Sequence, residues 1–137
     1  MKAIRSTPLY WLPTLAYMAL IWTLSSIPRV VAPVVIFKMQ DKVVHLIEYA
    51  ILAILCCYSV ARTRPRWKTP AVFLLSAFAA TLWGAIDEWH QSFVPNRNAD
   101  LMDAVADALG AIIGCALFLG IATARRIKPA GRWWLRR

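Results

Sequence analysis

The segment LMDAVADALGAIIGCALFLGIATA, residues 101–124, combines a strong membrane signal with two acidic residues. A membrane-spanning helix needs roughly 20 consecutive, mostly apolar residues, and only Asp103 and Asp107 interrupt this segment. An ionised side chain at the centre of a bilayer costs about 2.5 to 3.5 kcal/mol on the insertion scale, so such residues usually serve a function. The segment therefore predicts a transmembrane helix whose first turns belong to a polar site.

Three further runs, at 6–28, 43–61 and 69–86, have comparable length and few or no charges. The composition agrees, because 60% hydrophobic and 17% charged residues are far from the average soluble domain. The first run has no small-residue cleavage site before Pro28, so we expect a retained helix and not a cleaved signal peptide. We predict an all-α, single-domain protein over residues 1–137. It is an integral membrane bundle of four transmembrane helices at about 7–27, 42–61, 70–88 and 100–124, followed by a basic tail at 125–137.

Lysine and arginine are distributed unevenly between the two sides of the predicted bundle. Twelve of the 16 precede the first helix, join the second to the third, or follow the fourth, and only four lie on the other side. Positive residues accumulate on the cytoplasmic side of a membrane, so we expect both termini in the cytoplasm. Topology and attraction to anionic headgroups also account for the net charge of +9. The expected partners are therefore membrane lipids and not nucleic acid.

All seven carboxylates and both histidines lie in two windows, 41–49 and 87–107, which the predicted topology places on the outer side. Along each predicted helix the polar residues recur every three or four positions, so the residues of one helix share a face. The recurring residues are Asp41, His45, Glu48 and Tyr49 in the first window, and Asp87, Gln91, Asp100, Asp103 and Asp107 in the second. We expect these side chains, together with Arg97, to converge from three helix ends into one cluster.

Four spaced motifs run through nearly the whole chain. They are S-S-I-P at 25–28; D-K-x-x-H-x-x-x-Y-x-x-L with Asp41, Lys42, His45, Tyr49 and Leu52; D-E-x-x-Q-x-x-x-P-x-R with Asp87, Glu88, Gln91, Pro95 and Arg97; and D-x-x-x-D-x-x-G-x-x-x-G with Asp103, Asp107, Gly110 and Gly114. Taken together, these motifs resemble those of the VanZ-like family. The resemblance implies a small multi-pass protein of the bacterial inner membrane and cell envelope.

The same resemblance bears on function and on one site residue. The founding member of the VanZ-like family is associated with low-level resistance to the glycopeptide teicoplanin. The family is expected to have asparagine more often than aspartate at the position of Asp107, so the charge there is a feature of this chain. The resemblance supports the fold and the compartment, and it does not supply a reaction.

The residue types in the predicted cluster suit acid–base chemistry beside an anionic ligand. Asp41 and Glu48 flank His45 at about one helical turn, an arrangement that orients an imidazole and raises its basicity. The candidate acids and bases are Asp41, His45, Asp87 and Glu88. The candidate ligand-binding residues are Lys42, Glu48, Tyr49, Gln91, Arg97, Asp103 and Asp107. Lysine and arginine bind phosphate and carboxylate groups, so the expected ligand is a lipid-linked or cell-wall precursor with an anionic headgroup.

Several alternatives remain open from the sequence. The cluster would be purely structural if its residues only formed interhelical salt bridges, and embedded carboxylates also fit a small proton-coupled transporter. Ser92 is the only serine in the two windows, so no activated nucleophile is apparent and catalysis stays open. Because no motif such as H-E-x-x-H is present, we predict no metal and no cofactor, and we expect His90 in an exposed loop. A homo-oligomer is also open, although the G-x-x-x-G face at 110–114 most simply packs within the bundle.

Overall fold

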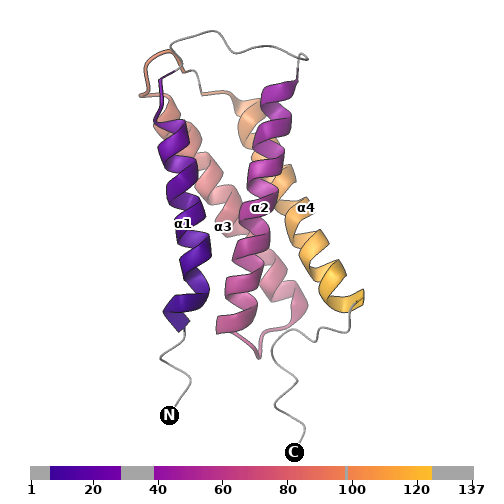
Figure 1. Cartoon of the computed structure of the whole chain (residues 1–137). Coiled ribbons are helices and arrows are strands. Elements are labelled where there is room, and N and C mark those ends of the chain that lie inside the picture. Colours follow the sequence, from indigo (N-terminus) through magenta and orange to yellow (C-terminus); the bar gives the residue numbers. More distant parts are fainter. Residues whose placement is uncertain (1–6, 29–38, 98, 125–137) are drawn as a thin grey trace, which may run out of the picture.

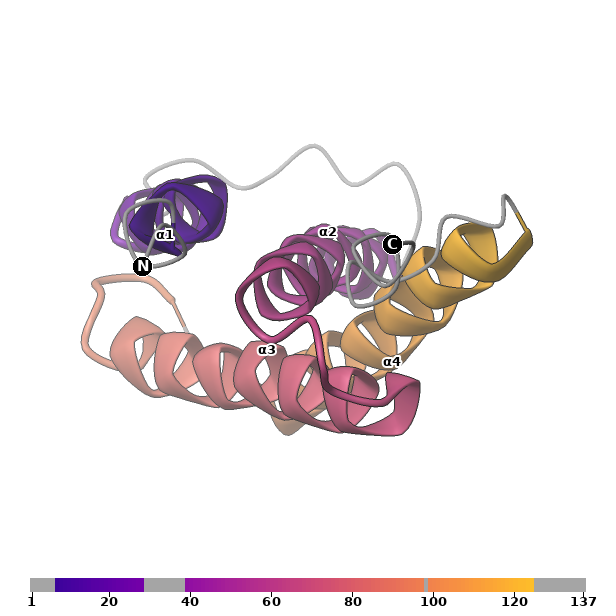
Figure 2. The ribbon, with the colours of Figure 1, turned by 90° about the horizontal axis from the view of Figure 1, so that it is seen from below.

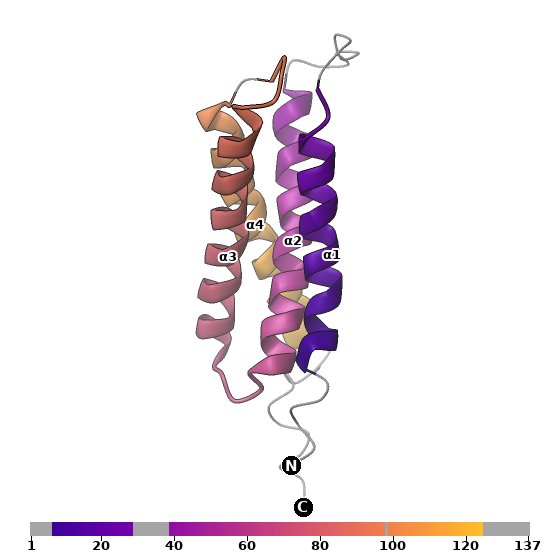
Figure 3. The same ribbon diagram turned by 90° about the vertical axis from the view of Figure 1, so that its left-hand side faces the viewer.

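The computed structural model describes residues 7–28, 39–97 and 99–124, and within these ranges it contains four helices and no strand. The helices are α1 (Thr7–Ser25), α2 (Gln40–Thr63), α3 (Thr69–Gln91) and α4 (Leu101–Ala124). They run alternately up and down, so the ends of α1 and α3 lie at the same end of the bundle as the starts of α2 and α4 (Figure 1 and Figure 3). The predicted all-helical bundle is confirmed. The predicted basic tail at 125–137 lies outside the described residues.

Three of the helices, α2, α3 and α4, are long and apolar enough to cross a membrane. The remaining helix, α1, has 19 residues and carries Pro13, two tyrosines and two tryptophans in place of aliphatic side chains. It nevertheless lies alongside α2 for most of its length (Figure 3) and also contacts α3, and its five leucines are exposed on the outside of the bundle. The chain is therefore a helical membrane protein.

The distribution of side chains is inside out compared with that of a soluble domain. Large aliphatic and aromatic side chains cover the outside, where Leu101 is 80% and Phe78 65% exposed, and small or hydroxyl-bearing side chains fill much of the interior. The buried Thr14 hydroxyl donates to Ser59 Oγ at 2.8 Å, and Ser59 donates to the carbonyl of Tyr10 at 2.6 Å, which joins α1 to α2. In lipid, apolar side chains gain little by turning inward, so small residues and interhelical hydrogen bonds hold the helices together.

Helix α2 lies in the middle of the bundle and contacts the other three helices (Figure 2). Helix α4 approaches it through two glycines. A Cβ atom on Gly110 would collide with the backbone carbonyl of Leu46, and one on Gly114 with that of Ala50. The G-x-x-x-G face therefore packs within the bundle, as predicted, and it draws the starts of α2 and α4 together.

We predict that Gly110→Ala destabilises the protein by about 1 to 3 kcal/mol, the usual cost of overpacking a close contact. The added methyl group must push α4 away from the rigid backbone of α2. Gly120→Ala is the matched control, because nothing lies within 4 Å of a Cβ atom at that position. Thermal unfolding in detergent measures both, and equal melting temperatures for the two variants would contradict the packing described here.

The orientation of the bundle stays a prediction, and cysteine labelling tests it. Ser92 lies just after α3 and Thr69 begins it, so the two exposed positions mark opposite ends of the bundle. We expect Ser92→Cys to react with a membrane-impermeant thiol reagent added to intact cells, and Thr69→Cys to react only after lysis. The three native cysteines are buried and give little background. The reverse labelling pattern would mean that the termini face outward.

Candidate functional site

One end of the bundle holds most of its buried polar side chains. This polar end comprises the last turns of α1 and α3, the first two turns of α2 and α4, and the α3–α4 link (Figure 1). Seven of the ten buried polar or charged side chains in the described residues lie there. They are Ser25, His45, Asp87, Glu88, Gln91, Asp103 and Asp107. Six of these were predicted from the sequence as site residues, and Ser25 was not.

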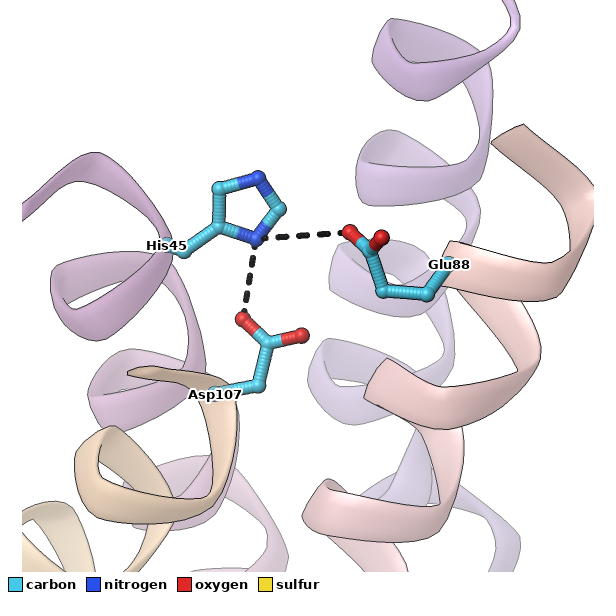
Figure 4. Close-up of side chains that lie close together, drawn as sticks. All are labelled: His45, Glu88 and Asp107. Atoms are coloured by element: carbon cyan, nitrogen blue, oxygen red, sulfur yellow. Dashed lines mark hydrogen bonds and ion pairs between the residues drawn. The ribbon is translucent and has the colours of Figure 1, made fainter. Parts of the chain in front are cut away.

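The centre of this end is a group of three buried side chains from three helices, which we call the His45 cluster: His45, Glu88 and Asp107. The Nδ1 atom of His45 lies 2.9 Å from Asp107 Oδ1 and 3.9 Å from Glu88 Oε1 (Figure 4). The three residues are 6%, 6% and 1% exposed, respectively. The predicted orientation of the imidazole by Asp41 and Glu48 on its own helix is therefore corrected, because a carboxylate of α4 holds Nδ1.

Two features of the backbone hold the carboxylates of the His45 cluster in place. The backbone N–H of Asp100 donates to Glu88 Oε2 at 3.1 Å, which leaves Oε1 on the side of the imidazole. Gly84 makes room for Asp107, because a Cβ atom there would lie 2.7 Å from Asp107 Oδ2 and 3.1 Å from a ring carbon of Tyr49. A side chain at position 84 would therefore displace the Asp107 carboxylate from His45.

Lys42 is engaged by two carboxylates at the outer edge of the site. Its ammonium donates to Asp100 Oδ2 and to Asp103 Oδ1, each at 2.5 Å. The hydrogen bond from Lys42 lowers the pKa of the Asp100 carboxyl, which lies just before α4. The lysine side chain is 21% exposed and that of Asp100 46%, so this pair borders solvent while Asp103 is buried. Lys42 thus links α2 to the start of α4 at the solvent-facing edge of the polar end.

A second network, the Asp87 network, links α1 to α3. Asp87 accepts hydrogen bonds from Ser25 Oγ at 2.5 Å and from Gln91 Nε2 at 2.8 Å. Gln91 Oε1 in turn accepts from Arg97 Nη1 at 3.2 Å. The same guanidinium donates to the carbonyls of Leu24 and Ile27 at the end of α1, at 3.1 and 3.3 Å. The S-S-I-P motif was the sequence signal for this contribution of α1, but it did not indicate which carboxylate the serine would bind.

The remaining predicted residues occupy different surroundings. Asp41 and Glu48 are half-buried on α2, and Glu48 lies about one turn further from the polar end than His45. Tyr49 is fully buried beside Gly84. The prediction of His90 in an exposed loop is wrong, because α3 continues to Gln91. His90 is half-buried in the last turn of that helix and stacks on Trp22 with a centroid distance of 3.9 Å.

Three buried polar atoms near the His45 cluster have no hydrogen-bond partner among the described residues. They are Glu88 Oε1, Asp107 Oδ2 and the hydroxyl of Tyr49. Most buried polar groups in proteins are hydrogen-bonded, and each exception requires an explanation. The cluster therefore offers free lone pairs in a place where leaving them unsatisfied is costly.

The fold and the site together define a small helical membrane protein with a buried polar centre at one end. The sequence model of the VanZ/LLP1 family matches residues 3–123, so the chain belongs to that family. This match confirms the resemblance drawn from the four motifs. No curated protein and no solved structure matched the chain.

We predict that Ser25→Ala destabilises the protein by about 1.5 to 3 kcal/mol, the contribution typical of a hydrogen bond to a charged group. The variant removes the only bond between α1 and Asp87 that the described residues show. Ser26→Ala is the matched control, since the Ser26 hydroxyl, just after α1, donates to the carbonyl of Trp22 and, among the described residues, bonds to no other helix. Thermal unfolding in detergent compares the two variants. An equal loss of stability would show that the bond to Asp87 contributes nothing.

Proposed function

We propose that this VanZ/LLP1-family protein lies in the bacterial inner membrane with its polar end outward, where it binds the anionic headgroup of a lipid-linked cell-wall precursor. The observation that supports the proposal is the unsatisfied His45 cluster, buried at one end of an apolar bundle. A ligand that reaches this cluster from the outer leaflet would meet an imidazole and two carboxylates suited to hydrogen bonding or proton transfer.

A purely structural role explains the cluster less well. Buried polar groups that only join helices stabilise a fold when every donor and acceptor is paired, and a partly paired set is worse than an apolar core. The Asp87 network meets that requirement, because both oxygens of Asp87 accept hydrogen bonds. The His45 cluster does not, because one oxygen of each carboxylate is unpaired. We therefore assign a structural role to the Asp87 network and a binding role to the His45 cluster.

The outer edge of the site suits a headgroup that carries phosphate. Lys42 and Arg97 are both partly exposed at the polar end, and Asp100, which shares the Lys42 ammonium, is exposed enough to be displaced. A phosphate oxygen that replaced Asp100 would keep a charge-assisted hydrogen bond to Lys42. Binding there would hold the reacting part of the ligand above His45, which lies one turn further along α2.

The alternative of a proton-coupled transporter receives less support. A proton path across the bundle needs titratable groups along its length, as in the carboxylate and histidine chains of pumps. Every Asp, Glu and His of the chain lies between residues 41 and 48 or between 87 and 107, which leaves the other half of the bundle without one. The interior there contains hydroxyls and thiols, such as Ser59 and Cys57.

We predict that His45→Gln abolishes the protein's contribution to teicoplanin resistance, the phenotype associated with the founding member of the family, while its abundance in the membrane stays close to that of wild type. Glutamine keeps a polar group near Asp107 but cannot exchange a proton. His90→Gln is the matched control, because that histidine stacks on Trp22 outside the cluster. Growth at graded antibiotic concentrations and immunoblots of membranes measure the two properties. A parallel loss of abundance and phenotype in His45→Gln would support the structural alternative.

A further inference from the structure

We propose that the His45 cluster binds a divalent transition-metal ion through His45 Nδ1, Glu88 and Asp107. The potential ligand atoms of these three residues all lie within 4.8 Å of one another. Two ligands bound to one ion at about 2.1 Å are separated by roughly 3 to 4 Å, depending on the angle between them. The distances from Nδ1 to Asp107 Oδ1 and to Glu88 Oε1, 2.9 and 3.9 Å, fit this range.

The unpaired oxygens give a second, independent indication of a ligand. Glu88 Oε1 and Asp107 Oδ2 are buried without a hydrogen bond among the described residues, and both carboxylates point toward the imidazole (Figure 4). The Tyr49 hydroxyl is unpaired as well, and its ring lies against the same glycine as Asp107 Oδ2. A cation between Nδ1 and Asp107 Oδ1 would satisfy Glu88 Oε1, and it would also satisfy Asp107 Oδ2 if that carboxylate bound the ion through both oxygens.

The remaining contacts of the cluster resemble the support that metal ligands usually have. Ligating side chains are commonly oriented by further hydrogen bonds from the protein, and such bonds affect metal affinity strongly. Glu88 is held by the backbone N–H of Asp100 through the oxygen that faces away from His45. Asp107 is positioned by the gap at Gly84 and by the close contact of Gly110 with Leu46, one turn further along α4. The three ligands are thus preorganised by three different helices.

The donor set indicates the class of ion. One imidazole nitrogen and two carboxylate oxygens, with no thiolate, suit manganese(II), iron(II) or zinc(II) and do not suit copper(I). Two carboxylates balance the charge of a divalent ion when the imidazole is neutral. For the ion to bind Nδ1, the imidazole must carry its single proton on Nε2, so a neutral His45 keeps its proton there and an imidazolium releases the Nδ1 proton to solvent. Three protein ligands leave further coordination positions open, as in catalytic metal sites.

Ligand spacing along the chain predicted no metal, whereas the structure brings three potential ligands together from three helices. A bound ion would also bear on the proposed function. Carboxylates outnumber lysine and arginine at the polar end, and Lys42 already binds two of them. A bound divalent ion would supply positive charge for an anionic headgroup. The use of the ion to bind an anionic headgroup rests on the proposed function, whereas ion binding itself does not.

Manganese(II) alone is the probe for the first test. The full-length protein, purified in detergent and stripped with a chelator, is titrated with Mn²⁺ and followed by electron paramagnetic resonance. With ¹⁵N-labelled histidine, we expect one ion per chain and a hyperfine coupling to a single histidine nitrogen. The coupling should vanish in His45→Gln and persist in His90→Gln, the only other histidine. Bound Mn²⁺ without a nitrogen coupling in the wild-type protein, or no binding at all, would overturn the proposal.

A second test separates the proposed ligands from the general acidity of the polar end. Calorimetric titration with Zn²⁺ compares Glu88→Gln with Asp87→Asn, two neighbouring buried carboxylates of α3. Loss of an outer-shell contact weakens metal binding 10- to 100-fold, so we expect loss of the Glu88 ligand to weaken it by more than about 100-fold. Asp87→Asn should bind within about tenfold of wild type. Equal affinities in the two variants would show that Glu88 is not a ligand, and the wild-type resonance spectrum remains decisive if either variant fails to fold.

Discussion

The close contact of α4 with α2 governs most of the site. At Gly110 and Gly114 the two backbones approach so closely that a Cβ atom would meet a carbonyl group of α2. Gly110 lies one turn after Asp107, and its contact, Leu46, follows His45 directly. The glycine contact therefore sets Asp107 opposite His45 at hydrogen-bonding distance. Wider spacing of the two helices would leave both side chains buried and separated, which is costly for groups that carry charge.

The membrane environment explains why such a polar centre is compatible with a stable fold. In a soluble domain the aliphatic side chains fill the interior, and a buried carboxylate displaces packing that contributes to stability. In this protein most of the large aliphatic side chains face outward, and small residues such as Ala53 and Ala111 pack between the helices. Close packing of small residues and interhelical hydrogen bonds together hold such helices to one another, so polar side chains are part of the packing as well as of the site.

The two networks at the polar end differ in what they leave unpaired. The Asp87 network joins α1 to the rest of the bundle through Ser25 and Arg97, and both oxygens of Asp87 are used. The His45 cluster lies beside it, yet one oxygen of each carboxylate is unpaired. Helix α1 is not among the three helices that are long and apolar enough to cross a membrane, and a fully paired polar connection gives it a defined position next to α3. This difference in pairing supports the proposed structural role of the Asp87 network and the proposed binding role of the His45 cluster.

Much of this protein could be predicted from local sequence, because spanning length and helical periodicity depend only on residues near one another in the chain. The apolar runs indicated four helices, the acidic windows indicated which ends carry the site, and G-x-x-x-G indicated a close helix contact. The hydrogen-bond partner of His45, by contrast, could not be predicted from local sequence. Spacing favoured Asp41 and Glu48 on the same helix, whereas the observed partner, Asp107, lies 62 residues away. Which faces of two helices meet depends on the rotation and depth of both, and these are set by packing across the bundle. The sequence by itself therefore determined the class of the fold and the types of residue in the site, and only the tertiary structure decided which of them bind one another.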